Sequence, residues 1–335
     1  MGRARYDVIG VGNAIVDVIA QCDDDFLRAQ SIEKGAMTLI DEARAETLYS
    51  AMAPGKEVSG GSAANTLAGI AALGARGAYI GKVADDELGK IFRHDLNAAG
   101  VDYDTAPLKD GPLTARCLIN VTPDAQRSMS TFLGASVFFS EEDIDAEKIG
   151  AARITYLEGY LFDRDEAKAA FVRAAEIAQA ADRLTSLTLS DSFCVDRHRA
   201  SFRQLVRNHI DILFANEAEL LSLYETDDFD DALAAVKAET RIAAVTRSEK
   251  GAVLIEDGHS VAIEAEPVEK IVDTTGAGDL FAAGMLTGLA TGRDLETSGR
   301  LGAIAAAEII SHIGARPNTN LKVLSQQRGI DLDSA

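Results

Sequence analysis

Short apolar runs alternate with longer helical stretches along most of the chain, and this order restricts the possible folds more than any other feature. YDVIGVG (6–12), AYIGKVA (78–84) and DILFANE (211–217) are short, apolar runs, as buried strands are. Residues 164–182 instead place alanine and larger apolar residues at helical spacing. Strands that alternate with helices predict a parallel sheet with crossover helices. We therefore expect an α/β sandwich whose central sheet is mostly parallel.

The middle of the chain has a different pattern. LTARCLINVT (113–122) and RSMSTFLG (127–134) are β-rich pieces separated by the turn PDAQ (123–126), which predicts a hairpin. We expect this hairpin to form a small β-rich lid together with residues near the N-terminus. The expected division is a lid of residues 13–45 and 110–135, and an α/β core of residues 1–12, 46–109 and 136–335.

The charge balance excludes some partners. The chain has 33 basic and 53 acidic residues, a formal charge of −20, so nucleic acid and anionic lipid are not expected to bind. Its three cysteines form neither a zinc motif nor a disulfide framework. No apolar run reaches the length of about 18 residues that a membrane span needs, and the N-terminal run is typical of a buried strand rather than a signal peptide. We expect a cytoplasmic protein.

The stretch VDTTGAGDLFAAG (272–284) predicts a binding site for an anion. Thr274 and Thr275 can cap the helix that follows, and Gly276, Ala277 and Gly278 leave the main-chain amides unhindered. Such amides at a helix N-terminus attract phosphate, and Asp279 in the first turn can accept a proton, although its pKa is expected to be low there. The alternative is a capped helix whose first aspartate only complements the helix dipole.

A second glycine cluster, SGGSAANTLAG (59–69), precedes another helix. Gly60 and Gly61 permit close approach of backbone, and Asn65 can reach a hydroxyl group of a ligand. The alternative is a tight turn capped by Ser62. A third cluster, GVGNAI (10–15), has isoleucine where a dinucleotide-binding fingerprint needs its third glycine, which argues against an NAD-dependent oxidoreductase.

DTTGAGD (273–279) and GGSAANTLAGIAALG (60–74) together resemble the two signatures of the ribokinase-type (PfkB) carbohydrate kinase family. The resemblance covers nearly the whole chain and implies a ribokinase-like three-layer α/β/α sandwich, with a nucleotide-binding core and a small β-sheet lid. GVGNAIVDVIA (10–20), DDDFL (23–27) and RSMSTFLGAS (127–136) are similar to the adenosine kinase-like branch of the family.

The resemblance also implies roles for individual residues. Asp279 matches the catalytic base, and the anion hole matches Gly276, Ala277 and Gly278. The positions that bind sugar or ribose hydroxyls match Asn13, Asp17, Gly61 and Asn65. The motif that organises Mg²⁺ through water matches Asn216 and Glu219, for which a polar turn capped by Asn216 is the alternative.

The remaining implied residues concern ATP and a monovalent cation. The nucleotide-binding loop matches Thr246, Ser248 and Gly251, although Ser248 stands where many members have glycine. The monovalent-cation site of many members, whose dependence on potassium varies, matches Asp273, Thr275 and the loop around Gly314. Two further side chains, Arg127 and Phe193, are candidates for contact with phosphate and with a base or sugar face.

The function that we expect from these residues is an ATP-dependent kinase. The resemblance implies transfer of the γ-phosphoryl group to a primary hydroxymethyl group of a nucleoside, with adenosine as the first candidate. A sugar kinase acting on ribose or fructose is the alternative, and a catalytically silent nucleotide-binding regulatory protein is another, because a fold does not fix a function. Members of the family occur as monomers and as lid-mediated homodimers, and the sequence leaves both open.

Overall fold

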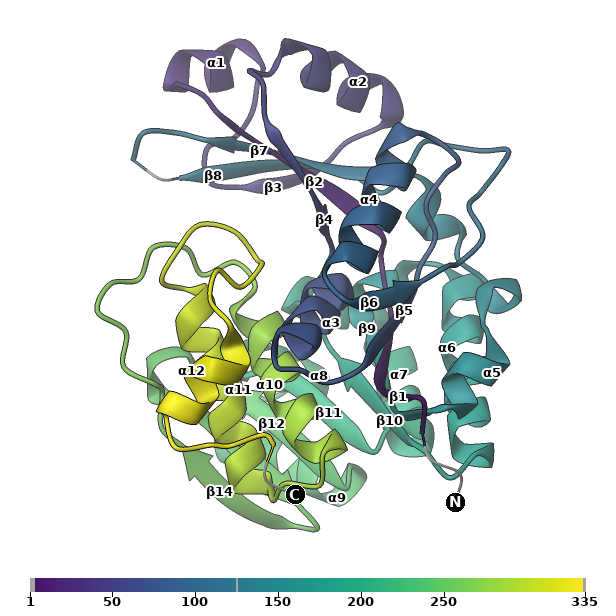
Figure 1. Cartoon of the computed structure of the whole chain (residues 1–335), viewed down its shortest axis with the longest axis vertical. Helices are drawn as coiled ribbons and strands as arrows, with labels where there is room; N and C mark the ends of the chain where they lie inside the picture. Colours follow the sequence, from purple (N-terminus) through teal and green to yellow (C-terminus); the bar gives the residue numbers. More distant parts are fainter. Residues whose placement is uncertain (1–3, 125, 334–335) are drawn as a thin grey trace.

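The computed structural model describes residues 4–124 and 126–333 and contains two β-sheets (Figure 1). The larger, in the order β14-β13-β12-β11-β10-β9-β1-β5-β6, is parallel from β12 to β6, whereas β13 and β14 run antiparallel. The expected mostly parallel central sheet is confirmed. Its strands are β1 (Tyr6–Val11), β5 (Gly77–Ile80), β6 (Val101–Tyr103), β9 (Ala152–Glu158), β10 (Leu184–Thr188), β11 (Ile212–Asn216), β12 (Ile242–Thr246), β13 (Ala252–Glu256) and β14 (His259–Ile263).

Helices cover both faces of this sheet because its central strands carry apolar side chains on both sides. In β1, Val8 packs into one hydrophobic core, and Ile9 and Val11 pack into the other. One core is built with α3 (Ser62–Ala72), α4 (Glu87–Ala98), α10 (Ala277–Ala290) and α11 (Leu295–Ile309). The other is built with α5 (Ala146–Gly150), α6 (Asp165–Ala180), α7 (Ser192–His209), α8 (Glu217–Tyr224) and α9 (Phe229–Glu239). The result is the expected three-layer α/β/α sandwich.

The smaller sheet is the lid, with its strands in the order β3-β8-β7-β2-β4. The predicted hairpin is confirmed, since β7 and β8 pair antiparallel. Two helices, α1 and α2, lie over the face of this sheet that points away from the core (Figure 1). The lid elements are β2 (Ile15–Gln21), α1 (Asp24–Ala29), β3 (Met37–Leu39), α2 (Glu42–Ala51), β4 (Lys56–Gly60), β7 (Ala115–Val121) and β8 (Arg127–Phe132).

The expected border between lid and core at residue 46 stays a prediction, but the elements around it argue for another position. That border divides α2, and it assigns β4 to the core. Instead, β4 pairs antiparallel with β2, with Asp17 opposite Val58. The partner of a short strand depends on pairing between distant segments, and this is why the local pattern did not place it. We propose to end the first lid segment at Gly60, where β4 ends and α3 follows.

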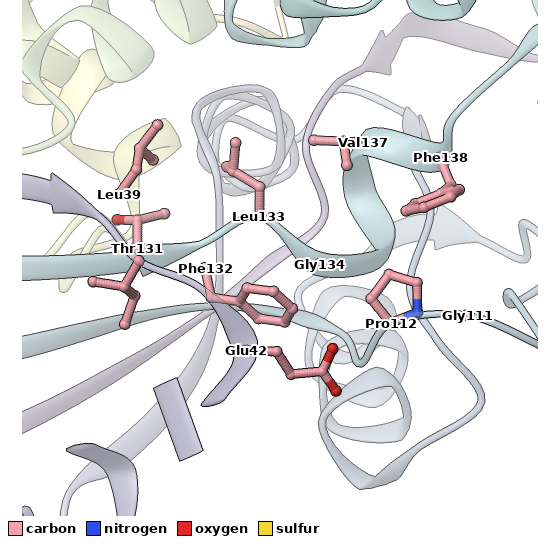
Figure 2. Close-up of a pocket in the computed structure, with 11 residues that line it drawn as sticks. Leu39, Glu42, Gly111, Pro112, Thr131, Phe132, Leu133, Gly134, Val137 and Phe138 are labelled. Carbon is pink, nitrogen blue, oxygen red and sulfur yellow. The ribbon is translucent and has the colours of Figure 1, made fainter. Parts of the chain in front are cut away.

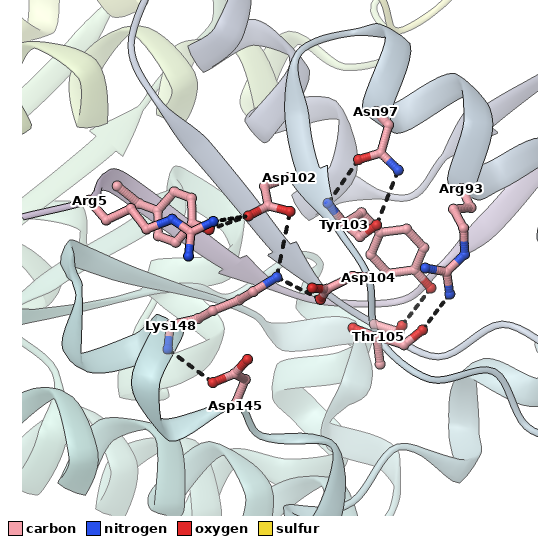
Figure 3. Close-up of polar contacts among 11 residues, drawn as sticks. Arg5, Arg93, Asn97, Asp102, Tyr103, Asp104, Thr105, Asp145 and Lys148 are labelled. Atoms are coloured by element: carbon pink, nitrogen blue, oxygen red, sulfur yellow. Dashed lines mark hydrogen bonds and ion pairs between the residues drawn. The ribbon is translucent and has the colours of Figure 1, made fainter.

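Charged and polar side chains hold the edge strand β6 in place (Figure 3). Lys148 of α5 donates to Asp104 at 2.6 Å and lies 3.6 Å from Asp102. On the other side of the strand, Arg93 Nη2 donates to the carbonyl oxygen of Thr105 at 2.6 Å. These contacts fix the sheet edge and involve none of the residues predicted to bind a ligand.

Beyond these elements, η1 (Gly134–Phe138), η2 (Glu141–Asp143), η3 (Gly159–Asp163) and η4 (Ser248–Lys250) are short 3₁₀ turns, and α12 (Leu321–Gln327) packs beside α11. Among the helices of the described residues, none combines the length and the apolar character that crossing a membrane requires.

Candidate active site

The predicted site residues gather along one edge of the central sheet. Because β1, β9, β11 and β12 run parallel, their carboxyl ends meet at the same edge. Asn13 follows β1, and Glu158, Asn216 and Thr246 end β9, β11 and β12. Ligands of open α/β sheets bind at this edge.

Helix α10 begins at this site with unhindered backbone. Its N-cap residue, Gly276, has φ 80°, a left-handed conformation that favours glycine. A Cβ added to Gly278 would have no other atom within 4 Å, so open space lies in front of this turn. Ala277 N donates to Thr274 O at 3.2 Å, whereas the amides of Gly276 and Gly278 have no acceptor within residues 4–124 and 126–333. Two of the three predicted anion-hole amides are therefore available to a ligand.

Asp279 lies in the first turn of α10 and contacts α3. We call the residues predicted to bind the hydroxyls of the phosphoryl acceptor (Asn13, Asp17, Gly61 and Asn65), together with the start of α3, the acceptor side of the site. Its Oδ1 accepts a hydrogen bond from Ser62 Oγ at 2.6 Å, and its Oδ2 accepts one from Asn65 Nδ2 at 3.0 Å. Burial raises the pKa of Asp279, while these two bonds and the Arg316 guanidinium act in the opposite direction. The expectation of a low pKa is therefore wrong, and the raised pKa makes this carboxylate a stronger base.

Gly60 and Gly61, before α3, form a tight turn. The sequence analysis gave this turn as the alternative to a ligand-binding segment. Gly61 has φ 93°, and a Cβ there would lie 2.2 Å from Asn13 O. A Cβ on Gly60 would lie 2.5 Å from the Asp17 carboxylate. Ser62 does not cap α3, because the N-cap residue is Gly61 and the Ser62 hydroxyl donates to Asp279 instead. The turn therefore brings Asn13 and Asp17 close to the start of the helix.

Three side chains have free acceptor capacity beside Asp279. Asn13 and Asn65 are buried, and the Oδ1 atom of each has no hydrogen-bond partner among the described residues. A buried acceptor without a partner is costly, and a hydroxyl donor from a ligand would satisfy it. Burial raises the pKa of Asp17 to about 6, an effect that Arg127 and Arg316 oppose and that Asp279 reinforces.

Glu158 belongs to this site although the sequence analysis did not select it. It is 1% exposed; its Oε1 accepts from Asn13 Nδ2 at 3.2 Å and its Oε2 accepts from Ala63 N at 2.8 Å. Burial raises its pKa to about 7 despite these bonds. It therefore orients Asn13 and binds the first turn of α3. The sequence feature that could have identified Glu158 is its position as an acidic residue at the end of the mostly apolar strand ITYLE (154–158).

Asn216 and Glu219 form a capping box at the start of α8. Asn216 Oδ1 accepts from Glu219 N at 2.8 Å, while the Glu219 carboxylate accepts from Asn216 N and Nδ2 at 2.9 and 2.7 Å. Burial raises the pKa of Glu219 to about 7, and Asp191 adds to the effect. The alternative of a capped turn is confirmed. A largely buried carboxylate at a strand end also suits Mg²⁺, which retains waters and needs few protein ligands.

Tyr160 links the two halves of the site. Burial raises the pKa of its hydroxyl, and four carboxylates that act on it electrostatically raise it further: Asp191, Asp279, Glu158 and Glu219. Acids of the acceptor side and of the predicted magnesium side therefore act electrostatically on the same hydroxyl. Phe193, at the start of α7, is 73% exposed and free to contact a ligand.

The predicted nucleotide loop follows β12, whose last residue, Thr246, is paired with Asn216. Ser248 has φ 53° and Gly251 has φ 79°, so both adopt the left-handed conformation. Ser248 thus adopts a backbone conformation that favours glycine. No hydrogen bond within the described part of the chain joins Thr246, Ser248 or Gly251 to the acceptor side.

The residues matched to a potassium site bind an arginine instead. Arg127, from lid strand β8, forms an ion pair with Asp273 and donates to Thr275 Oγ1 at 2.8 Å. Gly314 N donates to the same Asp273 carboxylate at 3.0 Å. Although burial opposes it, the pKa of Asp273 is lowered by these contacts. In this arrangement the oxygens of Asp273 and Thr275 are engaged, so a potassium ion does not fit beside them.

A cavity of about 630 Å³ adjoins the lid (Figure 2). Thr131 and Leu39 are paired across β8 and β3, and Thr131 is paired through Cys117 with Asp17. Paired residues point to the same side of a sheet, so Leu39 and Thr131 face the same side as Asp17. The other lining residues are mostly apolar and include Leu133, Val137 and Phe138. The sequence analysis did not identify this cavity.

Comparison with known proteins shows the family to which the chain belongs. The model of the pfkB family of carbohydrate kinases matches residues 37–321. Adenosine kinase from Sinorhizobium meliloti is 52% identical with a TM-score of 0.89, over 97% of this chain and all (100%) of that chain. A probable sugar kinase from Rhizobium etli CFN 42 is 52% identical with a TM-score of 0.90, over 97% and 99%. Adenosine kinase from Saccharomyces cerevisiae is 26% identical over 329 residues, 92% of this chain and 95% of that protein.

Proposed function

This chain belongs to the pfkB family of carbohydrate kinases and is a phosphotransferase acting on an alcohol group of a nucleoside or sugar, and we propose that its acceptor is a nucleoside, adenosine first. One observation carries the part of the proposal that concerns phosphoryl transfer. Asp279 is held by Ser62 and Asn65 of the acceptor-side helix and stands beside the open amides of α10. A proton acceptor and an anion site are thus adjacent.

The proposed reaction moves the γ-phosphoryl group of ATP to a primary hydroxymethyl group. The acceptor oxygen attacks the γ-phosphorus, the bond to the β–γ bridging oxygen breaks, and ADP leaves. The hydroxyl proton passes to the Asp279 carboxylate. The amides of Gly276 and Gly278 stabilise the charge on the phosphoryl oxygens. When Mg²⁺ is bound it neutralises phosphate charge, and Asn216 and Glu219 would hold it through water.

The acceptor side supports a nucleoside over a free sugar. The unpartnered oxygens of Asn13 and Asn65 and the Asp17 carboxylate suit the hydroxyls of a ribose. Two residues that line the largely apolar cavity, Leu39 and Thr131, face the same side of the lid sheet as Asp17, and a flat base would fill such a space better than a sugar hydroxyl. Two relatives named as adenosine kinases support the same choice.

A coupled assay of ADP release across nucleosides and free sugars tests the proposal. Adenosine should have a kcat/KM at least about tenfold above those of ribose and fructose, because only the nucleoside uses the cavity. A sugar with the higher kcat/KM would establish the sugar kinase alternative. ADP release with none of the acceptors would instead favour the regulatory protein.

A further inference from the structure

The loop between α11 and α12 touches both ends of the site. Its shape is held by Glu308, whose Oε1 accepts from the main-chain amides of Asn318 and Thr319, both at 3.0 Å. From this loop Gly314 N donates to Asp273, at the side of the site that faces Arg127 and Thr275. Two residues later, Arg316 reaches the acceptor side.

Arg316 bridges the two sides of the glycine turn. Its Nη2 donates to Ser59 O at 2.7 Å and to Ser59 Oγ at 2.8 Å, and its Nε donates to Ser59 O at 3.2 Å. Its Nη1 donates to Ala64 O at 2.7 Å. Ser59 is in lid strand β4 and Ala64 is in α3, so one planar guanidinium joins the lid to the core across Gly60 and Gly61.

The lid end of this bridge is held from its other side. Ser59 N and Ser59 Oγ both donate to Asp95 Oδ2, at 2.7 and 2.5 Å. Ser59 is therefore bound between the carboxylate of Asp95 in α4 and the guanidinium of Arg316. Such a fork is specific to arginine, because lysine cannot place parallel donors on two carbonyl oxygens.

Arg316 also brings positive charge to the two carboxylates of the acceptor side. The groups that face Asp17 are Arg127 of β8, Cys117 of β7, Arg316 and Asp279. The groups that face Asp279 are Ser62 and Asn65 of α3, Tyr156 and Glu158 of β9, Tyr160 of η3, Asp17 of β2 and Arg316. Arg316 lowers the pKa of both Asp17 and Asp279, against the effect of burial.

We propose that Arg316 is a positioning residue for the acceptor, which fixes the turn between lid and core and brings its charge to Asp17 and Asp279. This inference rests on the proposed function, because it assigns Arg316 to the step in which a hydroxyl group binds and loses its proton. Arg316 acts through the main chain of Ser59 and Ala64 and through the charge that it presents.

Three variants separate the contribution of the Arg316 hydrogen bonds from the contribution of its charge. Arg316→Gln removes the charge and the fork, and Arg316→Lys keeps the charge without the fork. Arg93→Gln is the matched control, because Arg93 also donates to a main-chain carbonyl and stacks on a ring, 5.0 Å from the centroid of Tyr103, but at the β6 edge (Figure 3). For each variant, KM for acceptor and ATP and the pH profile of kcat/KM are measured with the best acceptor of the wild type.

In Arg316→Gln we expect the KM for the acceptor to rise about tenfold or more, while the KM for ATP changes less than about threefold. The acid limb of the profile should move up by about one pH unit, because loss of the cation raises the pKa of both carboxylates. Arg316→Lys should restore the acid limb but not the KM, and Arg93→Gln should alter neither. An unmoved acid limb together with equal changes in both KM values would contradict the proposal.

Hydrogen exchange of residues 59–64 tests the bridge without catalysis. The amides should exchange at least about tenfold faster in Arg316→Gln than in the wild type or Arg93→Gln. Equal exchange would refute the bridge. If the wild type releases ADP with none of the acceptors, the proposed function fails. The hydrogen-exchange measurement still decides whether Arg316 forms the bridge. If Arg316→Gln does not fold, the KM values and exchange of Arg316→Lys decide it.

Discussion

At the scale of single residues, the site concentrates acids whose ionisation is costly. Burial raises the pKa of Asp17 to about 6 and those of Glu158 and Glu219 to about 7, and that of Asp279 is also raised. Asp279 acts electrostatically on both Asp17 and Glu158, in a chain with a formal charge of −20. Perturbed carboxylates of this kind are typical of sites that bind and transfer protons.

Replacing the base should abolish most of the turnover. Asp279→Asn should lower kcat at least about a hundredfold, because the amide cannot accept the hydroxyl proton. Steady-state kinetics measures the loss, and calorimetry should show ATP binding within about threefold of the wild type. The control is Ser62→Ala, which removes one hydrogen bond to Asp279 but keeps the carboxylate. Near-normal turnover of Asp279→Asn would show that another group takes the proton.

Glu158 should make the folded state less stable as the pH rises. Its pKa increases from the ordinary 4.5 to about 7, so between these values the folded chain binds more protons than the unfolded chain, and stability falls with rising pH. In Glu158→Gln this contribution disappears, and the melting temperature should vary less between pH 5 and 7. Thermal unfolding at several pH values measures the slope. Equal slopes would place the titrating group elsewhere.

At the scale of elements, the turn between β4 and α3 determines how the lid meets the core. Three groups converge on it: the backbone of Asn13, the carboxylate of Asp17 and the guanidinium of Arg316. The glycine pair permits this approach because no Cβ occupies the space. The turn is thus both a connection between two sheets and part of the acceptor side.

Replacing Gly61 of this turn by a residue with a Cβ should lower the free energy of unfolding more than the same replacement at another glycine with a positive φ. Gly61→Ala places a Cβ 2.2 Å from Asn13 O and should destabilise the protein by about 3 kcal/mol or more. Gly258→Ala is the control, since its φ of 81° is similar but its Cβ would meet no atom within 4 Å; we expect about 1 kcal/mol. Urea unfolding compares the two, and equal losses would show that the contact with Asn13 relaxes without cost.

The elements and signatures that the sequence predicts are those that depend on local pattern. The parallel sheet, the β7–β8 hairpin and the placement of Asp279 in the first turn of α10 follow from alternation and from short motifs. What the sequence did not reveal depends on contacts between distant segments. Glu158 meets Asn13 across 145 residues, and Arg316 meets Ser59 across 257. No spacing rule connects residues so far apart, so their roles required the structure.

At the scale of the whole molecule, an ion pair joins the lid to the core. Arg127 of β8 and Asp273, before α10, are buried to similar extents, with side-chain exposures of 11% and 7%. This pair connects the lid directly to the loop before α10. It also fills the position at which the sequence resemblance implied a potassium ion, so the guanidinium supplies the positive charge there.

Activity should therefore depend little on the monovalent cation. Replacing NaCl with KCl at equal ionic strength should change kcat by less than about twofold, because the Arg127 guanidinium already contacts the oxygens of Asp273 and Thr275. In Arg127→Ala, where the oxygens of Asp273 and Thr275 become available, potassium should stimulate the activity. Steady-state assays in the two salts measure both effects. Strong potassium activation of the wild type would mean that Arg127 leaves Asp273 during turnover.

The helices α1 and α2 cover the side of the lid sheet that faces away from the core (Figure 1). We predict that two copies of this protein do not stack their lid sheets through that surface, because apolar side chains of the lid strands, among them Val16 and Val18 at 0% and 3% exposure, are already buried within one chain. We therefore expect each chain to cover its own site with its own lid. The specific activity should consequently stay the same on dilution to nanomolar concentrations. The enzyme would then remain fully active where it is scarce.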